Sequence, residues 1–569
     1  MNNFFLSALC LLITLLPRAV NAASDTITYH VKNYNVKGDG KTDDLPALTA
    51  LFDKITKSDK PTKVIFRKKG RYRIGSHTND LYGRIFLNRL NNVVIEGNGC
   101  KLIVHPSSRA FAAYRSNNII IRNFVIDYSP LPYTQGRVRK VNHEKYYLEF
   151  KTEKGYPRPI VAGKEWYKGG KMIDCITANG KTRKFYQGHS WVKKVDSISK
   201  RTYAVHYDLN PQRQLRKGDY FCMKVEYPES RLIRNDTASN NAHSDEYIYT
   251  NTGTIAALGC NNLTLSGIKF LAAPLMTIVL KGCSRHTIEN CSIIGTKGRI
   301  VAGNSDGIHL KGNEWQPIIR NCYIERTMDD AIHIKMSGDR ITETESPRRF
   351  RISHMDISWD NTNLGSGKQI MIFNPETKEQ IDTCTIATYE PINYREGTVT
   401  VNRDIKRLKE GQYIYLMPCE EALIENCNFG TQLQRAILTH QSTTIRNCKI
   451  EDNGTGLDID LMSGGIEGPP TQRITVDGCT FKRLSVIGLN IKCPSMKYWQ
   501  GGKPQLIIKN NSFYLDKGIP LLEASNSCGI SLSNNTYFYN DNKPLREEVI
   551  KLHNSILIGD NTVFKKESK

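Results

Sequence analysis

The segment Leu423-Ile424-Glu425-Asn426-Cys427 returns as Thr444-Ile445-Arg446-Asn447-Cys448, with the two cysteines 21 residues apart. Short segments of the same kind, in which alternating apolar residues lead to Asn or Gly, recur at residues 92–98, 118–123, 262–267, 286–290, 318–321, 474–478 and 506–510. Short strands with Asn or Gly turns that repeat about every 20 to 30 residues, without helices between them, are typical of a β-solenoid. The repeat therefore predicts an all-β fold, a right-handed parallel β-helix.

Two stretches lack this repeat and predict two inserted small β-barrel or sandwich domains. Both contain alternating strands with Gly-Asp or Gly-Gln turns, as in residues 217–221 and 410–415. Before them, Asp44 and Pro46 predict a short helix from residue 45 that caps the first coil. The expected order is a signal peptide (1–22), a cap and first coils (23–126), a first insert (127–250), central coils with the active site (251–339), a second insert (340–420) and C-terminal coils (421–569).

Composition and the N-terminus indicate an exported protein. The chain has 569 residues, 24% of them charged, and a mean hydropathy of −0.44, which excludes a polytopic membrane protein and a disordered chain. The apolar run Phe4–Leu16, followed by small residues up to Ala22, predicts a signal peptide and a secreted or periplasmic protein. No Lys or Arg precedes this run, so an uncleaved signal anchor is the alternative. No later apolar run is long enough to span a membrane.

Five of the 15 cysteines share one local setting. Each follows Asn or Gly at the end of a repeat and precedes Ile or Phe two residues later: Cys291, Cys322, Cys427, Cys448 and Cys479. Equivalent positions in successive coils stack on one another, so we expect a ladder of buried thiols rather than disulfides.

We expect the catalytic residues where acidic residues recur at a spacing of one coil. Residues 304–311, Asn-Ser-Asp-Gly-Ile-His-Leu-Lys, align without gaps with residues 328–335, Met-Asp-Asp-Ala-Ile-His-Ile-Lys, at a spacing of 24. This register places Asp306 beside Asp330, and His309 beside His333, about 4.8 Å apart along the solenoid. The isoleucines and leucine of the two strands point inward, so the histidines and lysines are expected to point outward.

Later repeats extend the same polar column. Residues 456–460 and 488–492 fit the same template and place Asp458 and Asn490 in line with His333. An outer groove lined with His, Lys, Asp and Asn offers the paired donors and acceptors that sugar hydroxyls require.

Asp306, Asp329 and Asp330 are the candidate catalytic residues. Like charges this close cannot all ionise independently, so one acid stays protonated while another stays ionised. Glycoside hydrolysis requires this division, with the two carboxyl groups about 6.5 to 9.5 Å apart when configuration is inverted. The sequence does not distinguish the acid from the base. It also shows no zinc or calcium spacing, so no metal and no cofactor is expected.

These motifs resemble known carbohydrate-active families. Residues 304–307 with Asp329-Asp330 are similar to the polygalacturonases, although their Gly-His-Gly and Arg-Ile-Lys motifs are absent. Residues 126–136, 306–309, 321–322 and 328–331 more closely resemble glycoside hydrolase family 110, inverting exo-acting α-1,3-galactosidases with two barrels inserted in a β-helix. That family tends to continue with Asn-x-His-Gly after the second acid motif, whereas residues 332–335 here are Ile-His-Ile-Lys.

The resemblance implies which residues act. Asp306, Asp329 and Asp330 would be the essential carboxylates, and substrate contacts are expected from Asn304, His309, His333, Lys335, Asp458 and Asp460. The implied activity is release of α-1,3-linked galactose with inversion from a galactose-containing oligo- or polysaccharide. The formal net charge of +23 further indicates an anionic substrate such as carrageenan. A basic surface that serves solubility or wall adhesion is the alternative.

Three other functions remain open. An endo-acting carrageenase or polygalacturonase-like hydrolase would use the same acids. A β-helix lyase would use Ca²⁺ and a base such as Lys335 or Arg349, and a non-catalytic solenoid would only bind carbohydrate. Nucleic acid is not an expected partner, and the sequence leaves the oligomeric state open.

Overall fold

The computed structural model describes residues 26–75, 83–159, 173–186, 190–208, 215–225, 253–296, 298–312, 315–336, 338–354, 364–377, 379–393, 396–460, 468, 473–492, 506–526, 529–543 and 549–555. The proposed signal peptide, residues 1–22, lies outside these ranges. Within them, no helix combines the length and the apolar character that crossing a bilayer requires.

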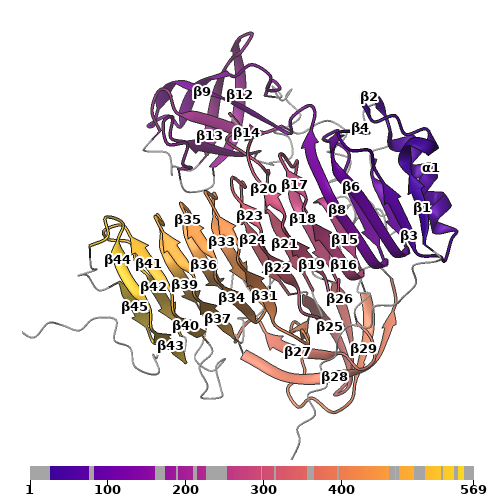
Figure 1. Cartoon of the computed structure of the whole chain (residues 1–569). Coiled ribbons are helices and arrows are strands. Elements are labelled where there is room, and N and C mark those ends of the chain that lie inside the picture. The colour runs from indigo at the N-terminus through magenta and orange to yellow at the C-terminus, as the bar shows by residue number, and fades with distance from the viewer. Residues whose placement is uncertain are drawn as a thin grey trace, which may run out of the picture.

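The core of the protein is a parallel β-helix, as the repeat predicts (Figure 1). One face is an 11-stranded sheet of β5 (Ile85–Asn88), β7 (Phe111–Tyr114), β15 (Gly253–Leu258), β18 (Met276–Lys281), β21 (Ile308–Lys311), β24 (Ile332–Lys335), β33 (Arg435–Thr439), β36 (Thr455–Asp460), β39 (Ile487–Lys492), β42 (Leu522–Ser525) and β45 (Ile550–His553). Neighbouring strands of this sheet belong to successive coils, and therefore carry equivalent residues of the repeat.

A 22-stranded sheet supplies the rest of the wall as two parallel rows. The first row is β1 (Ile27–His30), β3 (Thr62–Ile65), β6 (Asn91–Val104), β8 (Asn117–Tyr128), β16 (Asn261–Ser266), β19 (Thr287–Glu289), β22 (Ile318–Arg320), β31 (Ala422–Glu425), β34 (Thr443–Arg446), β37 (Ile474–Asp477), β40 (Leu506–Lys509) and β43 (Ile530–Ser533). The second row shares β6 and β8 and adds β2 (Asp39–Asp43), β4 (Arg71–Ile74), β17 (Lys269–Phe270), β20 (Ser292–Ile293), β23 (Tyr323–Ile324), β32 (Asn428–Phe429), β35 (Lys449–Glu451), β38 (Thr480–Lys482), β41 (Ser512–Leu515) and β44 (Thr536–Tyr539).

The asparagines of the repeat bend the chain between strands. Asn118, Asn262, Asn290, Asn426 and Asn447 all have φ between 53° and 55°, in the left-handed region that Asn tolerates better than most residues. Their amides also link coils, since Asn262 Nδ2 donates to Asn118 Oδ1 over 2.7 Å. This explains why Asn closes so many of the repeats.

The cysteine ladder is present inside the wall. The five repeat cysteines are buried and free of disulfides, and the Sγ atoms of Cys427 and Cys448 donate to backbone carbonyls of the preceding coil at 3.7 and 3.8 Å. The prediction of stacked thiols is therefore confirmed for these positions.

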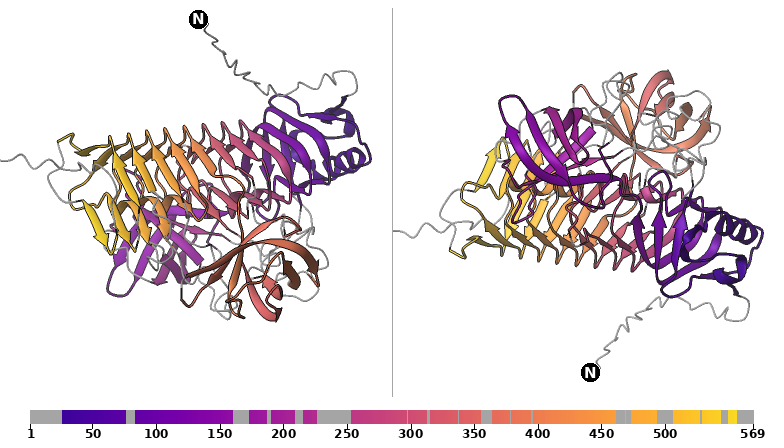
Figure 2. Two further views of the ribbon diagram at one scale, coloured as in Figure 1. Left: turned by 90° about the horizontal axis from the view of Figure 1, so that it is seen from below. Right: turned by 90° about the horizontal axis from the view of Figure 1, so that it is seen from above.

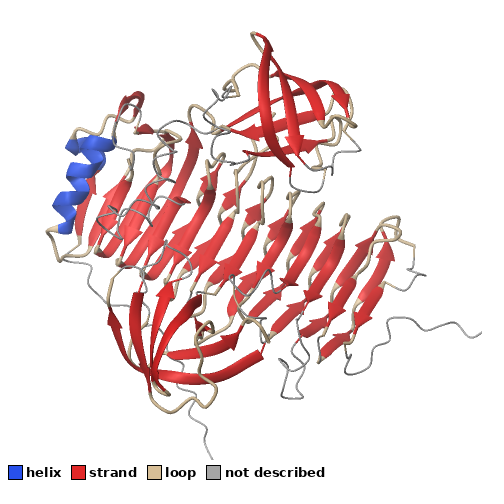
Figure 3. Ribbon diagram, turned by 180° about the vertical axis from the view of Figure 1, so that it is seen from behind, coloured by secondary structure: helices blue, strands red, loops and turns tan. Residues whose placement is uncertain are grey.

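A helix covers the N-terminal end of the solenoid (Figure 3). The 3-10 turn η1 (Val31–Tyr34) leads toward α1 (Leu45–Thr56), which buries Leu48, Leu51 and Phe52. Asp44 precedes the helix as predicted, but its carboxylate accepts hydrogen bonds from the backbone of Lys37 and Gly38 instead of capping the helix. The cap therefore closes the hydrophobic core at its first coil.

Two closed six-stranded barrels are inserted in the solenoid and lie on the same side of it (Figure 2). The first contains β9 (Tyr133–Asn142), β10 (Tyr147–Thr152), β11 (Ile173–Ala178), β12 (Ser190–Ser199), β13 (Thr202–Asp208) and β14 (Tyr220–Lys224). The second contains β25 (Gly338–Ser346), β26 (Arg349–His354), β27 (Gln369–Asn374), β28 (Glu379–Pro391), β29 (Glu396–Val401) and β30 (Tyr413–Leu416). Each barrel has its own apolar core, and the fold class predicted from the sequence is confirmed.

Candidate active site

Three aspartates from adjacent coils meet where the strands of the 11-stranded sheet begin. Asp306 comes just before β21, and Asp329 and Asp330 come just before β24. The backbone N–H of Asp330 donates to Asp306 Oδ1 over 3.3 Å, and one carboxylate oxygen from each of the three acids lies within 4.8 Å of the other two. The structure therefore brings the three predicted carboxylates together.

Gly307 allows this close approach of the two coils. A Cβ atom at this position would lie 2.6 Å from the backbone oxygen of Ala331, closer than real Cβ contacts. The backbone N–H of Gly307 instead donates to the carbonyl of Asp330 over 2.9 Å. The Asp-Gly pair is thus required by the stacking of the coils at the acids.

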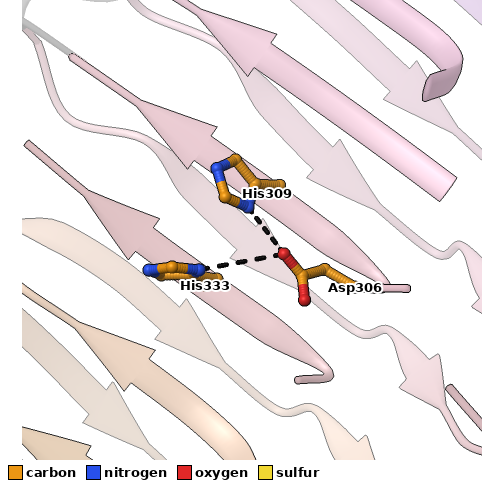
Figure 4. A group of neighbouring side chains, drawn as sticks. All are labelled: Asp306, His309 and His333. Atoms are coloured by element: carbon orange, nitrogen blue, oxygen red, sulfur yellow. Dashed lines mark hydrogen bonds and ion pairs between the residues drawn. The ribbon is translucent and has the colours of Figure 1, made fainter. Parts of the chain in front are cut away.

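Two histidines stand against Asp306 (Figure 4). His309 Nδ1 lies 2.6 Å from Asp306 Oδ2, and His333 Nδ1 lies 3.8 Å from the same oxygen. The two residues pair in register on β21 and β24, with ring centroids 4.7 Å apart and ring planes at 74°. The predicted stacking of the two histidines is therefore present, with both rings directed at one carboxylate.

The surroundings of the three acids shift their pKa values in different directions. Burial by itself would raise the pKa of Asp306, but the hydrogen bonds from His309 and His333 outweigh it and hold the pKa below its usual range. Burial, together with the neighbouring carboxylates, raises the pKa of Asp329 well above 3.8. Burial raises the pKa of Asp330 to about 7, although the charge of Arg435 opposes the increase. The site therefore holds one acid whose ionised form is favoured and two whose protonated forms are favoured.

Arg435 is a site residue that the sequence analysis missed. Its guanidinium NH1 lies 3.3 Å from Asp330 Oδ1, and its Nε donates to Asp458 Oδ2 over 2.6 Å. The carboxylate of Asp458 also accepts a hydrogen bond from Asn490 Nδ2 over 3.0 Å. The signal was present in the sequence, because Ala436-Ile437 repeats Ala331-Ile332 and so places Arg435 beside Asp330.

The polar column differs from the prediction in one position and in its exposure. Leu438 pairs with both His333 and Asp458, so an apolar side chain separates the two. The exposed fractions of His309, His333 and Asp458 are only 7%, 5% and 4%. The expected open groove is therefore covered along this stretch.

Contacts with the first barrel explain part of this covering. Asn304, expected to bind substrate, is 1% exposed and donates its amide to the carbonyl of Pro132 over 2.8 Å. Tyr133 of β9 donates its hydroxyl to the carbonyl of Val301 over 2.7 Å. Lys224, at the end of β14, lies close enough to Asp329 to favour its ionised form. The first barrel is thus a wall of the site.

Three lysines form a second column, which lies two residues beyond His309 on β21 and His333 on β24 and beyond Val279 on β18. Lys281, Lys311 and Lys335 end β18, β21 and β24 and pair in register. Lys281 and Lys311 are 7% and 5% exposed, whereas Lys335 is partly exposed. The side chain of Asp460, another expected substrate contact, lies outside the described part of the structure.

The acids and histidines also form two groups with donors suited to a metal ion. Asp306, His309 and His333 make one, and the three aspartates make the other, each with its donor atoms within 4.8 Å. In the first group, His309 Nδ1 and Asp306 Oδ2 are joined by a hydrogen bond of 2.6 Å.

A match to a family model agrees with this architecture. The family described as "Right handed beta helix region" matches residues 229–346 and 392–561. Alpha-1,3-galactosidase B of Bacteroides thetaiotaomicron is 23% identical, over 94% of this chain and 90% of that protein. Alpha-1,3-galactosidase A of Bacteroides fragilis is also 23% identical, over 79% of this chain and 74% of that protein. A solved exopolygalacturonase of Thermotoga maritima covers 94% of this chain and 93% of its own, with 12% identity and a TM-score of 0.40. Since the family match spans more than half of the residues, the chain belongs to the right-handed β-helix family.

Proposed function

We propose that this protein is a glycoside hydrolase that releases α-1,3-linked galactose from the non-reducing end of its substrate with inversion, outside the cytoplasm. The observation that carries the proposal is the meeting of Asp306, Asp329 and Asp330 in one site with divergent pKa values. The type of sugar and linkage follows the names of the relatives, which are α-1,3-galactosidases.

Asp329 is proposed as the general acid. Burial and the neighbouring carboxylates raise its pKa well above 3.8, which favours its protonated form, and it is the least buried of the three. A protonated carboxyl group can donate to the glycosidic oxygen as the bond to the leaving sugar breaks. The proton moves to the leaving group, and Asp329 is left ionised.

Asp306 and Asp330 are proposed to hold and deprotonate the attacking water. Asp306 is ionised, and its Oδ1 and Oδ2 accept hydrogen bonds from Asp330 N–H and His309. Both oxygens of Asp330 lie 3.3 to 3.4 Å from Arg435 NH1. Donors on every carboxylate oxygen weaken these acids as direct nucleophiles, which favours water as the attacking group. Attack by water in one step inverts the anomeric carbon.

Because the acids lie close together, the stereochemical outcome of the reaction tests the proposal of inversion. Nearest oxygens within 4.8 Å are closer than the roughly 6.5 to 9.5 Å between carboxyl groups that is usual for inverting glycosidases. The proposal of inversion therefore depends on the shared role of Asp306 and Asp330, and retention of configuration would contradict that role.

The substrate is proposed to carry an anionic group, as in a sulfated galactan. Lys311 and Lys335 lie two residues beyond His309 and His333 on β21 and β24, Lys281 continues this column on β18, and the whole chain has a formal net charge of +23. Sulfate oxygens accept hydrogen bonds from several ammonium groups at once, and a long-range positive field attracts polyanions.

The lyase alternative loses one of its two candidate bases. Arg349 lies on β26 of the second barrel, where its guanidinium pairs with Glu345 and Glu390. This leaves Lys335 as the candidate base of that alternative.

The test is incubation with α-1,3-linked galactosides and carrageenan oligosaccharides, followed by proton NMR of the first product. The proposal expects free galactose, released first as the β-anomer. Long oligosaccharide products would instead indicate an endo-acting hydrolase. An unsaturated product that absorbs ultraviolet light would indicate a lyase, and binding without turnover a carbohydrate-binding solenoid.

A further inference from the structure

We propose that Arg435 is a positioning residue that holds Asp330 in place to activate water, and that Asp458 acts through Arg435 instead of binding the sugar. This inference rests on the proposed hydrolase function. It assigns a role to Arg435 and changes the role that the sequence predicts for Asp458.

The backbone fixes Arg435 next to Asp330. Arg435 begins β33, and its carbonyl accepts a hydrogen bond from the N–H of Ala331 over 2.9 Å. Its own N–H donates to Asp330 Oδ1 over 3.1 Å. These contacts tie the start of β33 to the acid motif of the preceding coil, so the arginine side chain leaves the backbone beside the Asp330 carboxylate.

The guanidinium group is anchored more tightly to Asp458 than to Asp330. Nε lies 2.6 Å from Asp458 Oδ2, whereas NH1 lies 3.3 and 3.4 Å from the two oxygens of Asp330. The short contact fixes the planar group. The longer contacts leave the oxygens of Asp330 able to bind a water molecule as well.

Asp458 is placed as an anchor. One of its oxygens accepts from Arg435 and the other from Asn490 Nδ2, and the residue is 4% exposed. A buried carboxylate with both oxygens engaged is poorly suited to sugar hydroxyls. The chain Asn490, Asp458, Arg435, Asp330 thus runs across three later coils into the site.

The positive charge of Arg435 also favours the ionised form of Asp330. The groups that face Asp330 are Asp306, Asp329, His333 and Arg435, and two of these are acids. Taking a proton from water requires Asp330 to be ionised beside an already ionised Asp306. A cation held at a fixed distance favours that state without forming a close pair that would block the water.

The kinetic test is a double-mutant cycle of Arg435→Met and Asp458→Ala. We expect R435M to lower kcat by about 100-fold, with KM changed less than about threefold, because the interaction acts on the reacting water. The acidic limb of the pH profile of kcat/KM should move to higher pH, since the cation that favours ionised Asp330 is gone. D458A should lower kcat by about tenfold, and the double variant should be no slower than R435M.

Controls separate positioning from stability. Arg446→Met removes a matched arginine that pairs with Glu425 of the preceding coil, with Nε and NH2 at 2.8 and 2.6 Å from Glu425 Oε2, on the 22-stranded sheet. R446M should leave kcat and the pH profile unchanged. If R435M does not fold, Arg435→Lys keeps the charge but not the planar group, and should lower kcat without moving the acidic limb.

Two outcomes would overturn the proposal. One is an additive loss in the double variant, with a raised KM in D458A, which would make Asp458 a substrate contact. The other is a crystal structure of D458A in which Arg435 and Asp330 keep their positions, and this result does not depend on activity. A wild-type protein inactive on every α-galactoside would contradict the hydrolase function, while a displaced Arg435 in the D458A structure would still support the positioning role.

Discussion

His309 Nδ1 lies 2.6 Å from Asp306 Oδ2, within the wall of adjacent coils that also holds His333. Burial lowers the pKa of His309 to about 4, so its ring is neutral near pH 7. An ionised Asp306 can only accept, so we assign the proton of the neutral ring to Nδ1. This pair holds Asp306 ionised, and a permanently ionised group cannot serve as the general acid. This contact therefore excludes Asp306 as the general acid, and the lower burial of Asp329 favours it over Asp330 for that proposed role.

Asp329→Asn should lose activity in a way that depends on the leaving group. Without the acid, kcat on a disaccharide should fall by about 10² to 10⁴-fold. An aryl galactoside with a dinitrophenolate leaving group needs no proton, so its hydrolysis should fall far less. Steady-state kinetics on both substrates measures the difference, and an equal loss on the two would assign the acid role elsewhere.

Asp330→Asn should abolish turnover and change how stability depends on pH. The pKa of Asp330 is raised from 3.8 to about 7 in the folded protein. Wild type therefore loses stability as pH rises from about 4 to about 7, because the folded state must give up a proton that it binds more tightly than the unfolded chain does. The variant lacks this loss, so its Tm relative to wild type should increase across that range. Melting curves at several pH values test this, and a constant difference would contradict the raised pKa.

Gly307→Ala should slow the enzyme because it separates the two coils that carry the acids. Its Cβ would meet the Ala331 carbonyl at 2.6 Å, and relief of the clash costs about 1 to 3 kcal/mol of stability. A shift of the Asp306 carboxylate by about 1 Å should lower kcat by about 100-fold. Gly488→Ala is the matched control, since its Cβ would meet the Leu521 carbonyl, also at 2.6 Å, farther along the sheet. Both variants should have a lower Tm, and full activity in G307A would show that the coil spacing does not matter.

Lys335→Gln should distinguish anionic from neutral substrates. On a sulfated α-1,3-galactoside we expect KM to increase about tenfold, because one ammonium partner of the sulfate is lost. On the unsulfated substrate KM should change little. Lys449→Gln, at an exposed position of β35, is the control for net charge. Equal effects of K335Q on both substrates would contradict a role of the lysine column in binding an anion.

Contacts between neighbouring coils were predictable from the sequence, and contacts of the barrels with the solenoid were not. The gapless spacing of 24 residues was enough to predict that His309 pairs with His333, and the structure has this pairing. Arg435 lies 105 residues beyond Asp330, because a whole barrel is inserted between their strands. The repeat specifies how one coil stacks on the next, but carries no information about what folds over the outer face. For this reason the burial of the histidines and the contact of Asn304 with Pro132 were not foreseen.

The solenoid continues across both barrels in unbroken register. Ile255 pairs with Phe111 across the first insertion, and Ile319 pairs with Ile424 across the second, as in coils that follow each other directly. A barrel can therefore be lengthened, exchanged or remodelled during evolution without moving the acids. Changes in the barrels can then alter which glycan is recognised, while the solenoid keeps the residues that cleave the bond. Exchanging barrels between relatives is therefore a direct way to new specificities.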